Sequence, residues 1–127
     1  MKETITTDKA PAAVGPYSQG IKAGGLIFTA MQIPLDPATG QIVGENVAGQ
    51  TARVLDNIEA ILTAGGSSLE EVVKTIVYLT DMDDFGAMNA TYRQYFSKSP
   101  PARGAVEVTR LPKGALVAIE AIAVAGN

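Results

Sequence analysis

The chain has 127 residues, a length that fits one domain spanning residues 1–127, and 46% of them are hydrophobic, which is enough for a core. It contains no His and no Cys, which excludes disulfides, thiol nucleophiles and zinc–thiolate sites and makes a metal site or other cofactor unexpected. The net charge is −3 and the ten Lys and Arg residues are scattered, so we expect no nucleic-acid surface.

No apolar segment opens the chain, and no run approaches the ~18 apolar residues of a membrane span. We therefore expect a cytoplasmic protein without a membrane partner. The first predicted elements are a short strand at residues 4–7 and two strands within residues 17–33, joined by a tight turn at Gly24 and Gly25.

A helix is predicted over residues 46–66, because apolar residues recur there at helical spacing. Asn46 is expected to cap its start, and Gly65 or Gly66 its end. Ser68 and Glu71 form a candidate capping box for a short turn, followed by a β-branched strand at residues 72–80.

A second helix is predicted from a cap at Asp83 through Phe96, with Phe85, Met88, Tyr92 and Tyr95 on its buried side. The acidic run at residues 81–84 could suggest a hard cation, but helix capping explains it better than a metal does. Two further strands, at residues 104–110 and 115–125, complete the order β-β-α-β-α-β-β.

This order predicts a two-layer α+β domain, with one sheet and two helices on one of its faces. The last strand is apolar on both alternating faces, and two helices cover only one of them. We therefore expect an oligomer that buries sheet against sheet.

Glu120 is the only charged residue of that last strand, and Arg103 follows two prolines and precedes two small residues. An even-numbered hairpin loop around Pro112 would pair Ala105 with Glu120 and place Arg103 diagonally on the same face, whereas an odd loop would reverse this register. An arginine with space around it suits a planar carboxylate. The alternative interpretation is that both charges are simply solvated surface residues.

Several stretches resemble one family along essentially the whole chain: "APAAVGPYSQGI", "QIPLDPATGQIV" and "PPARGAVEVTRLPKGALVAIEAIA". They are similar to the Rid family, the reactive intermediate deaminases. The resemblance implies a chorismate-mutase-like α+β fold with a mixed sheet. It also implies a homotrimer whose sheets form a central barrel, with three sites between subunits.

The resemblance further implies hydrolysis of enamines and imines, such as 2-aminoacrylate, 2-iminopropanoate and 2-iminobutanoate, to 2-keto acids and ammonia. Arg103 matches the arginine that binds the substrate carboxylate, and Glu120 the glutamate that positions the attacking water. Tyr17 and Asn89 match pocket residues. Ala105 lies where many members have a Cys whose backbone faces the ligand.

Met31 departs from the pattern, because many members have Gly there, within Ser-Gly-Gln. A methionine would reshape the pocket and its substrate range, although Met also commonly fills gaps in a core. Two other functions remain open: a non-catalytic ligand-binding or regulatory trimer, and RNA cleavage with inhibition of translation, which the acidic balance disfavours. A chaperone-like role is possible, but nothing in the sequence specifies it.

Overall fold

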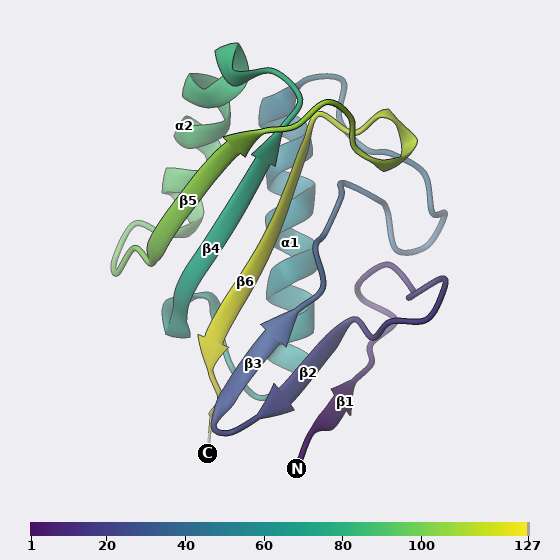
Figure 1. Cartoon of the computed structure of the whole chain (residues 1–127), viewed down its shortest axis with the longest axis vertical. Helices are drawn as coiled ribbons and strands as arrows, with labels where there is room; N and C mark the ends of the chain where they lie inside the picture. Colours follow the sequence, from purple (N-terminus) through teal and green to yellow (C-terminus); the bar gives the residue numbers. More distant parts are fainter. Residues whose placement is uncertain (127) are drawn as a thin grey trace.

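The computed structural model describes residues 1–126 and consists of one six-stranded sheet with two long helices on one face (Figure 1). The strands are β1 Glu3–Ile5, β2 Gly20–Ala23, β3 Leu26–Thr29, β4 Val72–Leu79, β5 Ala102–Glu107 and β6 Val117–Val124. The helices are α1 Val47–Ala64 and α2 Phe85–Tyr95, with short 3-10 turns at Leu69–Glu71, Met82–Asp84 and Pro112–Gly114. The predicted α+β class with two helices on one face of a mixed sheet is confirmed.

The order of strands across the sheet is β1-β2-β3-β6-β4-β5. β4 and β5 are parallel and are connected through α2, whereas the other neighbouring pairs are antiparallel. Gly24 and Gly25 make the predicted tight turn between β2 and β3 with φ values of 59° and 78°, which suit glycine.

Helix α1 forms as predicted. The side chain of Asn46 accepts a hydrogen bond from the backbone N of Gly49, and Gly65 is the C-cap. Its buried apolar side is the predicted one: Val47, Val54, Leu55, Ile58, Ile61 and Leu62. These side chains pack on the inward residues of β6, namely Val117, Ile119, Ala121 and Ala123, all of which are buried.

Two caps differ from prediction. Asp81, rather than Asp83, is the capping residue: its Oδ1 accepts from the backbone N of Asp83 at the 3-10 turn before α2. Ser68 makes no side-chain capping bond, so the turn at Leu69–Glu71 forms without the predicted capping box. Both deviations arise because a 3-10 turn, which is tighter than an α-helix, begins each of these segments.

The opposite face of the sheet carries no helix, as the apolar pattern of the last strand predicted. Phe28, Val106 and Val124 are exposed there, while Ile76 and Ile122 are half-buried. We call this the open face. Within residues 1–126, no helix has the length and apolar character that a membrane crossing requires.

Candidate functional site

Arg103 lies on the edge strand β5 and faces α2. Its parallel neighbour Thr75 points to the same side and hydrogen-bonds the hydroxyl of Tyr92. Nη1 of Arg103 donates to Oδ1 of Asn89 at 2.6 Å. The guanidinium carbon also lies 5.2 Å and 4.8 Å from the ring centroids of Phe85 and Tyr92, which is a cation–π arrangement. Helix α2 therefore holds the arginine head in one place.

The guanidinium opens into a pocket of about 620 Å³ between the C-terminal half of α2 and the start of β5. Pro100 and Pro101 form part of its wall, which stiffens the approach to Arg103. Within residues 1–126 the only ion pair joins Lys98 to Glu70, so no carboxylate of the described chain neutralises Arg103. A cation held by neutral groups at a pocket mouth can bind the carboxylate of a ligand.

Glu120 lies on β6 and points to the open face. Ile76 of β4 stands directly opposite it, and Tyr78 follows two residues further on the same face. The phenolic hydroxyl of Tyr78 donates to Oε1 of Glu120 at 2.5 Å. This hydrogen bond, aided by burial, raises the pKa of Tyr78 above its ordinary value, so the phenol keeps its proton and stays a donor at neutral pH.

Met31 lies next to an irregularity in the pairing of β3 and β6, in the stretch that runs alongside Glu120. Phe28 pairs with Ile122 and Gln32 bridges to Ile119. The three residues between Phe28 and Gln32 therefore face only two residues between Ile119 and Ile122. The extra residue makes a bulge at Ala30 and Met31, and bulges re-aim side chains. The Met31 side chain is 39% exposed, which argues against the interpretation of Met31 as a core filler.

Met31 and Tyr17 line a second pocket of about 680 Å³, formed by residues 11–19, 30–40 and the turn at Pro112 and Lys113. Buried Gln19 fixes one wall, because its Nε2 donates to the carbonyls of Thr7, Ala10 and Pro11. Buried Asn57 of α1 fixes another, because its Nδ2 donates to the carbonyl of Leu35 at 3.0 Å. The two sides of this pocket are thus attached to the core.

The predicted hairpin between the last two strands is wrong. β4 lies between β5 and β6, and residues 108–116 cross its C-terminal end, where Val108 N bonds to Leu79 O and Thr80 N to Leu116 O. Arg103 therefore does not share a face with Glu120. Ala105, opposite buried Val77, faces the helices beside Arg103.

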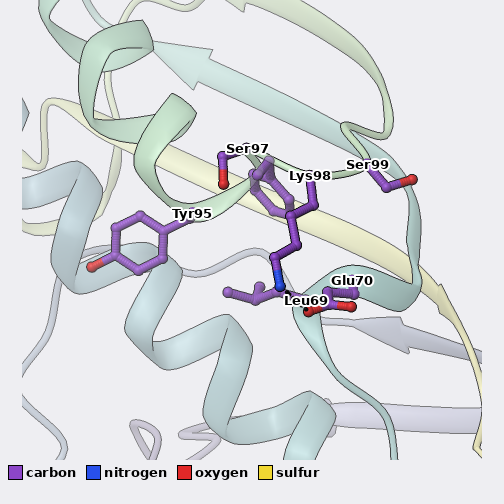
Figure 2. A pocket seen from close by; sticks show the side chains of 7 residues that line it. Leu69, Glu70, Tyr95, Ser97, Lys98 and Ser99 are labelled. Atoms are coloured by element: carbon purple, nitrogen blue, oxygen red, sulfur yellow. Dashed lines mark ion pairs between the residues drawn. The ribbon is translucent and has the colours of Figure 1, made fainter.

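The structure thus places the six predicted site residues in two groups. Arg103 and Asn89 are joined directly, with Ala105 on the same face, whereas Glu120, Met31 and Tyr17 lie toward the open face and the second pocket. A further cavity of about 120 Å³ beside the ion pair of Lys98 and Glu70 contains none of the six (Figure 2).

Sequence reasoning missed the contribution of three residues. Phe85 and Tyr92 were predicted only as the buried side of α2, and Tyr78 was predicted only as part of a strand. The period-two alternation of 72–80 could have placed Tyr78 on one face, but its partner on β6 follows only from the strand order.

Comparisons with known proteins show the family of the chain. The sequence profile of the family described as Endoribonuclease L-PSP matches residues 7–125. A RutC family protein of Pyrococcus horikoshii is 58% identical over 97% of this chain and 98% of its own length. A protein of Escherichia coli K12 named 2-iminobutanoate/2-iminopropanoate deaminase is 47% identical over 98% of both chains.

Solved structures give the same result. A putative endoribonuclease from Thermotoga maritima superposes with a TM-score of 0.96 at 48% identity and covers both chains completely. The E. coli protein TdcF, solved with bound serine, has a TM-score of 0.92 at 42% identity over 96% of this chain and 98% of its own. The chain therefore belongs to the Endoribonuclease L-PSP family, the Rid/YjgF family that its sequence resembles.

Proposed function

We propose that this chain hydrolyses short 2-imino acids and their enamine forms to 2-keto acids and ammonia, at sites shared between copies of a homotrimer. The observation that carries the proposal is Arg103: a guanidinium fixed by Asn89 and two aromatic rings, open to a pocket and free of any carboxylate within residues 1–126. A carboxylate is the group common to all these substrates, and bidentate capture by an arginine both binds and orients it.

Two relatives support this choice of substrate. Proteins named 2-iminobutanoate/2-iminopropanoate deaminase from Salmonella typhimurium and E. coli are each 47% identical to this chain. The TdcF structure holds serine, a small amino acid with a carboxylate beside a nitrogen-bearing carbon. A 2-imino acid has the same arrangement of these two groups.

The chemistry requires neither thiol, imidazole nor metal. An enamine first gains a proton at C3 and becomes the imine. Water then adds to C2, and its proton passes to the Glu120 carboxylate. The glutamate returns this proton to the nitrogen, so C2 carries both an NH2 group and a hydroxyl. It then carries the hydroxyl proton to the NH2 group, the C–N bond breaks as the C=O bond forms, and ammonia and the 2-keto acid are released. Positioned proton transfer of this kind supplies ~10²–10⁴-fold acceleration.

The proposal needs two copies because Arg103 and Glu120 of one chain face opposite sides of the sheet. We expect a second copy to bring its β5 edge, with Arg103 and Asn89, toward Glu120 and toward the pocket that Met31 and Tyr17 line. The exposed apolar residues of the open face supply a surface for that association.

A coupled assay tests the function: a serine or threonine dehydratase generates the imine, and keto-acid formation is followed with and without this protein. Arg103→Ala should abolish acceleration while leaving the trimer intact. Arg103→Lys should lower kcat/KM by about 10–100-fold, because a point charge cannot form the two-pronged contact. Near-normal activity in either variant contradicts the proposed role.

Co-expression of Arg103→Ala with Glu120→Gln, under two affinity tags, tests the shared site. In mixed trimers with shared sites, about one third of the sites regain both residues, so activity returns. If each site lay within one chain, the mixture would stay as inactive as its components. Some relatives are named as endoribonucleases, so RNA incubated with the same preparation tests for that activity, and we expect the RNA to remain intact.

A further inference from the structure

Tyr78 and Glu120 form an isolated polar pair within an apolar part of the open face. Tyr78 stands opposite Ala118, and Glu120 stands opposite Ile76, so the two polar side chains are diagonal neighbours on adjacent strands. Diagonal side chains on one face of a sheet lie within reach of a long aromatic residue. The resulting contact joins the Tyr78 hydroxyl to Oε1 of Glu120 at 2.5 Å.

This contact holds one oxygen of the carboxylate and leaves the other free. Within residues 1–126, no other side chain or backbone group hydrogen-bonds the Glu120 carboxylate, and no cation pairs with it. Its cross-strand neighbour Ile76 and its face neighbours Ala118 and Ile122 are apolar and offer no alternative partner. The second carboxylate oxygen is therefore available to a water or a ligand.

A free carboxylate side chain has several rotamers, and only some aim an oxygen at a given point. A hydrogen bond to one oxygen restricts these rotamers, as partners of ligating or catalytic groups generally do. The phenol suits this task because it is rigid beyond χ2 and, with its pKa raised by Glu120 itself, remains protonated at neutral pH. Lys74, the other charged residue on this part of the face, makes no ion pair with Glu120.

We infer that Tyr78 is a positioning residue for the reaction: its hydroxyl fixes the Glu120 carboxylate so that the free oxygen is aimed at the attacking water. This inference rests on the proposed deaminase function. Tyr78 does not touch the substrate. It acts through Glu120, so its removal should slow the chemical step without weakening capture of the substrate carboxylate by Arg103.

Tyr78→Phe is the direct test, because it removes only the hydroxyl. We expect kcat to fall about 10-fold, a typical effect of losing a group that orients a functional side chain, with KM within about twofold of wild type. In a Glu120→Gln background the same substitution should cost nothing further. A purely structural role would instead add its effect in both backgrounds.

Tyr95→Phe is the matched control, because the Tyr95 hydroxyl also donates to a carboxylate, that of Asp56 at 2.9 Å, but between α1 and α2. It should leave kcat and KM unchanged. Equal kcat for Tyr78→Phe and wild type, or an equal loss in both backgrounds, overturns the inference.

A phenol titration measures the contact without any substrate. The ultraviolet difference between wild type and Tyr78→Phe isolates the ionisation of Tyr78, and its midpoint should fall toward 10.0 when Glu120→Gln removes the anionic acceptor. An unchanged midpoint overturns the inference. Wild-type protein that is inactive on every imino acid tested overturns the proposed function, and the role of Tyr78 with it. An active wild type with an equally active Tyr78→Phe overturns the inference alone.

Discussion

The open face of the sheet gives a quantitative prediction about assembly. Phe28 is its most voluminous exposed apolar residue and 39% of its surface remains in contact with solvent in a single copy. It lies on β3 and pairs with Ile122 of β6, the neighbouring strand. In the proposed trimer, packing of sheet against sheet would cover this surface. Phe28→Ala should therefore weaken assembly much more than it weakens the fold of one copy.

The magnitude follows from area. A phenylalanine contributes roughly 200 Å², so the exposed share of Phe28 is about 80 Å², worth about 2 kcal/mol when covered at ~25 cal/mol per Å². Three copies lose about 6 kcal/mol, which lowers the equilibrium constant for trimer formation by about four orders of magnitude. Because this constant scales with the square of concentration, the dissociation midpoint rises about 100-fold, for example from nanomolar to about 0.1 μM.

Sedimentation velocity across that concentration range measures the shift, and circular dichroism checks that the monomer keeps its fold. Val43→Ala is the control: Val43 is 40% exposed, but it lies in the loop before α1, outside the sheet. The Val43→Ala variant should dissociate over the same concentration range as wild type. A wild-type protein that is monomeric at micromolar concentration, or a Phe28→Ala variant that sediments as wild type does, refutes the reasoning.

Two further predictions concern substrate choice and pH. Met31→Gly should raise the ratio of kcat/KM for 2-iminobutanoate over 2-iminopropanoate, by a factor corresponding to ~1–3 kcal/mol, because it frees space in the pocket that Met31 and Tyr17 line. An unchanged ratio with a lower Tm would identify Met31 as a packing residue instead. Burial, reinforced by Asp56, raises the pKa of Tyr95 to about 12. The phenol of the unfolded chain ionises near 10.0, so the part of the free energy of unfolding that this pKa difference supplies is present below pH 10 and is lost between pH 10 and 12. Denaturant unfolding across this pH range should show a smaller loss for Tyr95→Phe than for wild type.

Elements whose signal is local were predictable from the sequence. Each is marked within a few residues by a repeat of apolar residues or by a typical cap or turn residue. Examples are the apolar side of α1 with its Asn46 cap, the turn at Gly24 and Gly25, and the last strand, which is apolar on both faces. The open face was predictable for the same reason, because two helices cannot cover both sides of a sheet.

Strand adjacency was not predictable in this way. Residues 104–110 and 115–125 are consecutive strands separated by a short turn-like segment, which favours a hairpin. The structure instead inserts β4 between them, because α2 returns β5 parallel to β4 and leaves it at the edge of the sheet. Which strands pair depends on how whole elements pack, and the residues of the 111–114 turn carry no sequence signal for that pairing.

The sequence named candidate site residues one by one but not their arrangement. The resemblance supplied Arg103, Glu120, Tyr17, Asn89, Ala105 and Met31. The bond between Arg103 and Asn89, the irregular pairing beside Met31, and the contact of Tyr78 with Glu120 all join segments far apart in the chain. A bulge has no signature in an apolar strand without glycine, and the sequence of Ala30 and Met31 offers none.

The corrected strand order strengthens the case for a shared site. β4 separates β5 from β6, so Arg103 and Glu120 lie about 10 Å apart across the sheet and point to opposite faces. In a 2-imino acid the carboxylate is bonded directly to the carbon that water attacks, so both groups must be within reach of neighbouring atoms. No such substrate can bridge the two faces of one copy. If both residues act in the reaction, the arginine and the glutamate come from different copies, and the specific activity must fall on dilution as the proposed assembly dissociates.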